Sequence, residues 1–130
     1  MKLFAFVTLL FVGMTGAALA ADPLEGHWRT AADDNGNSGL IQVVPCGDKF
    51  CGTLIQAFGP DGKEIASPNI GRRLIWDTAP RGDGVYRGRV YSPDRDQEYN
   101  SKLVLTGDRL SVSGCRFGFC REGGVWTRVK

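Results

Sequence analysis

Four cysteines offer the clearest chemistry in this sequence of 130 residues, because they form two pairs with the same spacing. Four residues separate Cys46 from Cys51, and four separate Cys115 from Cys120. Paired thiols can hold a structural zinc ion, exchange disulfides with other proteins or form structural disulfides. Zinc sites usually have shorter spacings, and thiol oxidoreductases place Cys-x-x-Cys at a helix start, which this sequence lacks. Structural disulfides are therefore the favoured interpretation.

The first twenty residues have the features of a cleavable export signal. Met1-Lys2 give a positive start, residues 3–12 form an apolar run, and Ala18-Leu19-Ala20 matches a small-residue cleavage site. The apolar run is shorter than the roughly 20 residues of a membrane-spanning helix. We expect cleavage after Ala20, which leaves residues 21–130 as a periplasmic or secreted protein that does not span the membrane.

Export to an oxidising compartment strengthens the disulfide interpretation. Four cysteines allow three connectivities, and the sequence leaves all three open. A local bridge that closes six residues stabilises the fold by about 2 kcal/mol, whereas a bridge between the distant pairs contributes about 4.5 kcal/mol. Local bridges form more easily, because each pair flanks a four-residue loop whose facing positions can meet disulfide geometry. We predict the local pairing, Cys46 with Cys51 and Cys115 with Cys120.

The other polar residues form no catalytic or metal-binding pattern. His27 is the only histidine, and its place in Gly26-His27-Trp28 makes it a strand residue rather than a general base. No nucleophile elbow marks a Ser-His-Asp arrangement. Two oxygen-rich runs, at 33–37 and 94–98, lack the spacing of a calcium loop. We therefore predict a non-enzymatic protein with no cofactor and no metal.

One group of basic and aromatic residues is a candidate ligand contact. Its members are Arg72, Arg73, Trp76 and Arg81. Such a group can receive a carboxylate or phosphate at the mouth of a barrel. The alternative, which we favour, is a solvated rim whose arginine stems cover apolar surface.

Composition indicates one small folded domain. Hydrophobic residues make up 42% of the chain and charged residues 23%, which excludes intrinsic disorder. The 16 basic residues include Lys2 of the leader, so the mature chain has 15 against 14 acidic residues and a net charge of +1. This near balance excludes an electrostatic nucleic-acid binder.

Short runs rich in β-branched and aromatic residues, separated by turn clusters, predict about eight strands. The runs are residues 27–30, 40–44, 53–58, 73–76, 85–91, 99–105, 109–113 and 125–129. Alternation places Tyr86, Val90, Leu103 and Leu110 on the inner face. A single sheet must curl to cover that face, and closure also removes its edges. We predict an all-β domain at 21–130, an up-and-down antiparallel barrel rather than a sandwich, with residues 63–72 crossing its mouth.

Both ends of the mature chain resemble lipocalins. The chain opens with Gly26-His27-Trp28 and closes with Trp126-Thr127-Arg128. In lipocalin-type barrels the arginine packs on the tryptophan in a cation–π contact that seals one end. The resemblance implies a structural seal made of Gly26, Trp28, Trp126 and Arg128.

A longer ordered set of residues resembles an uncharacterised family of exported bacterial proteins, domain of unknown function 2147. The set is Gly26-His27-Trp28, Pro45-Cys46-Gly47, Cys51-Gly52, Asn69, Arg72-Arg73, residues 88–93, Tyr99, residues 110–115, Cys120 and Trp126-Thr127-Arg128. Asp94-Arg95-Asp96-Gln97 departs from the family, which usually has a glycine there. The resemblance implies a small β-barrel of the cell envelope and brings no established activity.

These expectations lead to two functional hypotheses. The first is an envelope binding protein that takes a small, partly apolar ligand in the barrel or at its mouth. The second is an interaction module with a filled core and a protein or cell-wall partner. A cavity of roughly 300 Å³ or more would favour the first. The ligand and the oligomeric state are not specified by the sequence.

Overall fold

The computed structural model describes residues 21–130, and the predicted export signal lies outside this range. The described residues form strands and turns only, and they include no helix that could span a membrane. The strands are β1 (Gly26–Arg29), β2 (Ser38–Cys46), β3 (Lys49–Phe58), β4 (Glu64–Ile65), β5 (Arg73–Gly82), β6 (Val85–Ser92), β7 (Gln97–Thr106), β8 (Arg109–Arg116) and β9 (Phe119–Val129). Each of the eight predicted runs overlaps one of these strands.

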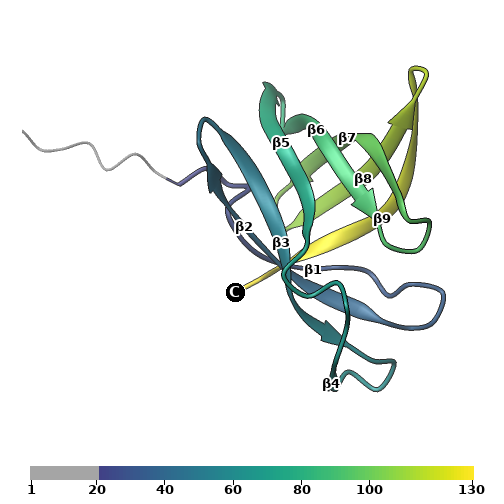
Figure 1. The fold of residues 1–130 in the computed structure, drawn as a ribbon. Coiled ribbons are helices and arrows are strands. Elements are labelled where there is room, and N and C mark those ends of the chain that lie inside the picture. Colours follow the sequence, from purple (N-terminus) through teal and green to yellow (C-terminus); the bar gives the residue numbers. More distant parts are fainter. Residues whose placement is uncertain (1–20) are drawn as a thin grey trace, which may run out of the picture.

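Eight of the strands close into an antiparallel barrel, as predicted (Figure 1). Neighbours in sequence pair along the sheet, and the ring closes because β1 pairs with both β2 and β9 while β2 pairs with β3. The two-residue strand β4 lies outside the ring and adds to the end of β3. The barrel is therefore an up-and-down barrel with one short extension.

Inward-facing side chains form the core. Trp28, Ile41, Ile75, Leu103 and Leu110 are completely buried, and they come from five different strands of the ring. Alternation along each strand brings them to one face, because successive side chains of a strand point to opposite sides of the sheet. The core thus occupies the inside of the barrel.

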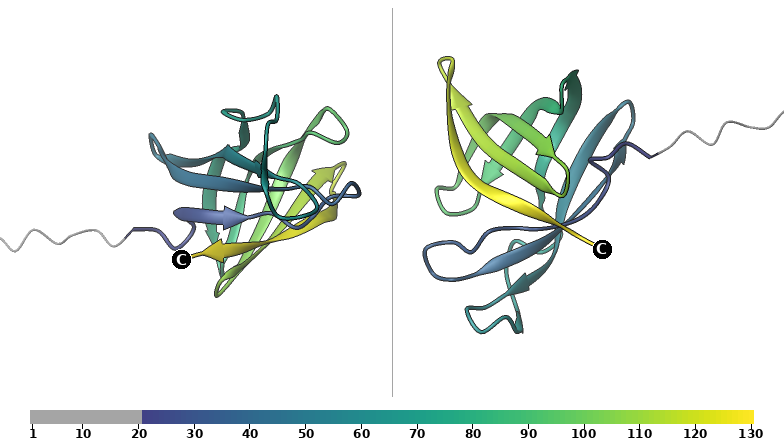
Figure 2. Two further views of the ribbon diagram at one scale, coloured as in Figure 1. Left: turned by 90° about the horizontal axis from the view of Figure 1, so that it is seen from below. Right: turned by 180° about the vertical axis from the view of Figure 1, so that it is seen from behind.

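Successive connections of an up-and-down barrel alternate between its two ends. The tight turns at 47–48, 83–84 and 107–108 lie at one end, together with the C-terminus and residues 21–25 (Figure 2). The longer connections at 30–37 and 59–72, and the turns at 93–96 and 117–118, lie at the other end. The two ends therefore differ in the length and packing of their loops.

Candidate functional site

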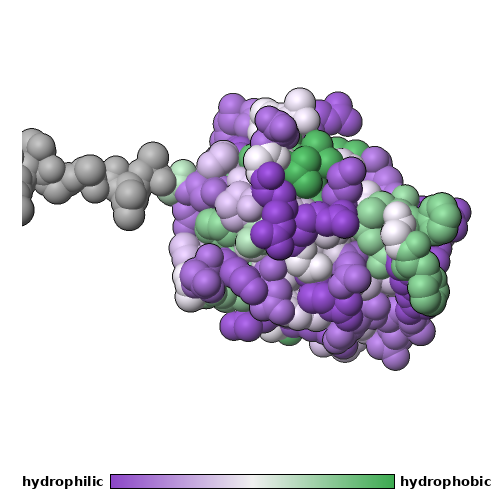
Figure 3. All heavy atoms as spheres, turned by 90° about the horizontal axis from the view of Figure 1, so that it is seen from above, coloured by the Kyte–Doolittle hydropathy of each residue, from purple (hydrophilic) through white to green (hydrophobic). Residues whose placement is uncertain are grey.

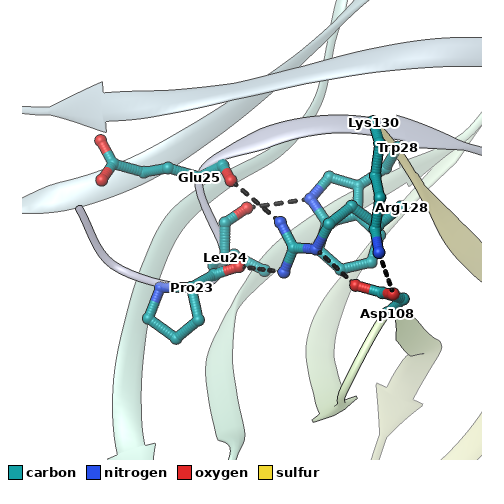
Figure 4. A network of polar contacts seen from close by, with 7 residues as sticks. All are labelled: Pro23, Leu24, Glu25, Trp28, Asp108, Arg128 and Lys130. Carbon is teal, nitrogen blue, oxygen red and sulfur yellow. Dashed lines mark hydrogen bonds and ion pairs between the residues drawn. The ribbon is translucent and has the colours of Figure 1, made fainter. Parts of the chain in front are cut away.

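The end with the tight turns is closed by Arg128 and the residues around it (Figure 4). The Arg128 guanidinium carbon lies 4.4 Å from the centre of the Trp28 ring. Its nitrogens donate to the carbonyl oxygens of Glu25, at 3.2 Å, and of Pro23. Its Nε donates to a carboxylate oxygen of Asp108 at 3.1 Å. One side chain thus joins β9, the β7–β8 turn and the segment before β1.

The segment before β1 is held inside this end. Leu24 is completely buried, and its carbonyl oxygen accepts a hydrogen bond from Nε1 of Trp28 at 2.9 Å. A carboxylate oxygen of Asp22 accepts from the Leu24 amide at 2.8 Å and from the Tyr86 hydroxyl at 2.6 Å. Burial, and then this hydrogen bond to Asp22, raise the pKa of Tyr86 above its ordinary value. Residues 22–25 therefore plug the closed end.

The four residues of the expected seal fall into two groups. Gly26, Trp28 and Arg128 meet at the closed end, and Gly26 has a φ of +124°, a backbone conformation that favours glycine. Trp126 lies two residues earlier on β9, on the same inward face, and it lines the cavity described next. Arg128 thus belongs to the closed end, whereas Trp126 contributes to the wall of the cavity.

A cavity of about 790 Å³ lies inside the open end of the barrel. Its inner wall is apolar and is formed by Leu54, Leu74, Val90, Val112 and Trp126, which come from five strands. Its rim is polar, because the loops and strand ends at this end supply charged side chains. The charged residues of the lining are Asp33, Asp34, Asp94, Arg95, Arg121 and Glu122. The site is a wide, partly open pocket with an apolar floor and a polar, charged rim.

The predicted ligand contacts Arg72, Arg73, Trp76 and Arg81 do not line this cavity. Arg72 approaches it indirectly, because its guanidinium carbon lies 3.5 Å from the centre of the ring of Tyr91, which does line it. Trp76 packs against the core, and Arg73 and Arg81 are exposed. Eight residues of strand span about 26 Å, so β5 carries Arg81 to the opposite end from Arg73. The structure therefore does not bring these four residues together.

Sequence reasoning also missed most of the cavity lining. The lining residues come mainly from four segments, 30–39, 65–69, 90–95 and 121–124, which lie far apart in the chain. The segment at 65–69 belongs to the stretch that was expected to cross the mouth, and it does border the cavity. The predicted topology could have identified these segments, because alternate connections of an up-and-down barrel lie at the same end.

Both cysteine pairs form local disulfides. Cys46 is bonded to Cys51 across the β2–β3 turn, and Cys115 is bonded to Cys120 across the β8–β9 turn. Residues 21–130 therefore contain no free cysteine. Within that range no group of three or more histidine, cysteine or acidic residues is placed to hold a metal ion.

Comparison with known proteins agrees with the barrel. The structure is similar to that of protein HP1028 from the human pathogen Helicobacter pylori, described as belonging to the lipocalin family. The TM-score is 0.63 at 17% sequence identity, over 82% of this chain and 83% of that chain, so the likeness shows the fold. No curated protein matches the sequence significantly. Residues 26–128 match the family described as "Uncharacterized protein conserved in bacteria (DUF2147)". The chain thus belongs to the DUF2147 family of bacterial proteins and has a lipocalin-like fold.

Proposed function

We propose that this protein is an exported, non-enzymatic binding protein that takes a small, partly apolar ligand into the open end of its barrel. The observation that carries the proposal is the cavity of about 790 Å³. Small-molecule sites generally occupy about 300–1,000 Å³ and combine apolar walls with a few polar groups. The second hypothesis, a module with a filled core, is disfavoured by this volume.

The lining suggests how such a ligand would be oriented. Leu54, Leu74 and Val112 offer only apolar contacts on the inner wall, so the apolar part of the ligand would lie deepest. A polar group buried there would lose its hydrogen bonds to water without replacement, which is costly. Arg121 at the entrance can instead contact a polar head that stays hydrated. An amphipathic molecule fits this division.

Two features support the proposal that the protein is exported. Two disulfides in one small domain are typical of proteins that fold in an oxidising compartment. The sequence of residues 1–20 has the pattern of a cleavable signal. Both features support the proposal of a periplasmic or secreted location.

A fluorescent apolar probe tests the cavity directly. We expect N-phenyl-1-naphthylamine to bind the purified protein and to gain fluorescence as it enters the apolar pocket. Gly124→Leu should weaken this binding, because Gly124 lines the cavity and a Cβ there would meet only Ala31, at 3.7 Å, so the added side chain occupies cavity space. The matched control is Ser113→Leu, on the outer face of β8, which adds a similar apolar side chain away from the cavity.

The outcomes separate the two hypotheses. Binding that Gly124→Leu leaves unchanged, as in Ser113→Leu, would place the probe elsewhere and count against the cavity. Failure of the unaltered protein to bind any apolar probe would favour the interaction module. Native mass spectrometry of protein purified from its own periplasm would then identify the class of a natural ligand by its mass.

A further inference from the structure

The tip of the β8–β9 hairpin exposes two phenylalanines. Phe117 is 96% exposed and Phe119 is 83% exposed, whereas the other exposed large hydrophobic residues lie between 37% and 43%. In Figure 1 this hairpin projects beyond the neighbouring loops, and Figure 3 shows a hydrophobic patch over it. The folding of the barrel does not explain why two aromatic side chains at a projecting tip are almost fully exposed to solvent.

The backbone of the tip is also constrained. Phe117 and Gly118 have φ values of +51° and +81°, and Arg116 pairs with Phe119, so they form the two-residue turn of a tight hairpin. The disulfide between Cys115 and Cys120 closes the strands directly behind it. Asparagine or glycine would adopt this backbone more readily than phenylalanine. The aromatic residue at position 117 therefore serves something other than the turn.

Basic side chains surround the tip. Arg116 and Arg121 flank the phenylalanines in sequence, and Nη1 of Arg87 lies 3.7 Å from the sulfur of Cys120. Two acidic residues lie on the same part of the barrel. Glu122 accepts a hydrogen bond from Ser111, and Glu98 is paired with Arg89 at 3.6 Å, so the three arginines outnumber the one carboxylate that has no basic partner. The hairpin therefore combines an apolar tip with a positively charged base.

We propose that this hairpin docks the protein on the surface of a membrane that contains anionic lipids. Phe117 and Phe119 enter the interfacial layer, while Arg87, Arg116 and Arg121 contact lipid phosphates. Segments that lie in the membrane interface combine apolar insertion with basic residues in the same way. The proposal goes beyond ligand binding and does not depend on it.

The size of the patch favours a membrane over a protein partner. Two phenylalanine side chains can bury about 300–500 Å² between them. A stable protein interface buries at least about 1,200 Å² in total and requires a matching surface, whereas a lipid layer adapts to a small projection. The tip also lies at the open end of the barrel and points away from the β1–β2 connection and β4 (Figure 2).

Vesicle co-sedimentation tests the proposal. We expect the protein to sediment with vesicles of phosphatidylcholine and phosphatidylglycerol, to bind pure phosphatidylcholine more weakly, and to be released by added salt. Phe117→Ser with Phe119→Ser should reduce binding by about tenfold or more. The matched control is Val44→Ser with Val129→Ser, which removes two hydrophobic residues that are 41% and 43% exposed near the closed end. This control should bind like the unaltered protein.

A second variant reports on insertion itself. Phe119→Trp should shift its fluorescence emission to the blue when anionic vesicles are added. Unchanged sedimentation of the double serine variant, or an unshifted tryptophan at position 119, would overturn the proposal. So would equal binding to neutral and anionic vesicles. Conversion of a dimer to a monomer by the serine substitutions would assign the tip to a second copy of this chain instead.

Discussion

Arg128 connects parts of the chain that are far apart in sequence. Its side chain contacts Pro23 and Glu25 near the start of the described chain, and Asp108 in the β7–β8 turn. It also covers the ring of Trp28. A planar guanidinium can satisfy all of these partners at once because its donors point in several fixed directions. We therefore propose that Arg128 holds residues 22–25 in place at the closed end.

We expect Arg128→Ala to lower the free energy of unfolding by about 2 kcal/mol. The variant loses a cation–π contact and leaves two carbonyl oxygens without their charged donor. Thermal unfolding followed by circular dichroism would show this as a lower melting temperature. Arg128→Lys is the control, since it keeps a positive charge near Asp108 but has all its donors on one nitrogen and no planar group to cover Trp28. We expect the melting temperature of Arg128→Lys to lie between those of Arg128→Ala and the unaltered protein. An unchanged melting temperature for Arg128→Ala would contradict the seal.

At the scale of the strand, the structure explains why position 88 on β6, the first residue of the family-like stretch 88–93, is a glycine. The pairing of β5 with β6 shifts register between Trp76 and Ala79, and Asp77 has a φ of +49°. This irregularity brings the carbonyl oxygens of Trp76 and Asp77 against Gly88. A Cβ at position 88 would lie 2.6 Å and 2.7 Å from them. Glycine is therefore required where β5 bends.

We expect Gly88→Ala to destabilise the barrel by about 2 kcal/mol or more, because both opposing atoms belong to the backbone and cannot rotate away. Gly123→Ala is the matched control. A Cβ there would meet only the carbonyl oxygen of Val112, at an ordinary 3.7 Å. Chemical denaturation of the two variants provides the comparison. Equal stability of the two would show that β5 can move aside at this position.

The strands were predictable where alternation is regular, and their extensions were not. Along β7, inward Ser101 and Leu103 alternate with outward neighbours, and the predicted run at 99–105 is shorter than the strand by only three residues. The run predicted at 73–76 is less than half of β5, because the bend at Asp77 interrupts the alternation. The polar and glycine-rich first part of β9 carries no apolar pattern, yet it pairs with β8. Its place in the sheet is set by its partner.

The candidate site was harder to predict than the strands, for a related reason. The lipocalin-like ends of the chain correctly suggested that Arg128 covers Trp28, because that contact joins two adjacent strands in register. The cavity depends instead on which loops meet in space. Arg81 is close to Arg73 in sequence but lies at the other end of β5, whereas Asp33 and Arg121 are far apart in sequence and line the same cavity. Distance along the chain was a poor guide here.

At the scale of the whole molecule, we expect the two ends of the barrel to differ in stability. The closed end is held by the contacts of Arg128, by a pair between Lys130 and Asp108 at 3.2 Å, and by completely buried Leu24. The open end surrounds a cavity, so its loops have fewer buried apolar contacts to hold them. Local opening costs least where such contacts are few. Ligand entry is therefore expected at the end that opens most easily.

Hydrogen exchange with and without N-phenyl-1-naphthylamine tests this asymmetry. A ligand in the cavity must displace or order the segments at 30–39 and 90–95, so their amides should exchange more slowly when the probe is bound. The turns at 83–84 and 107–108 lie at the far end and should be unaffected, apart from amides that exchange only by global unfolding. Any ligand that binds the folded state slows the exchange of those amides, by an amount set by the ligand's concentration and affinity. Protection centred on the closed end would place binding there and refute the open-end pocket, while protection confined to 30–39 and 90–95 would identify the loops that a natural ligand must pass.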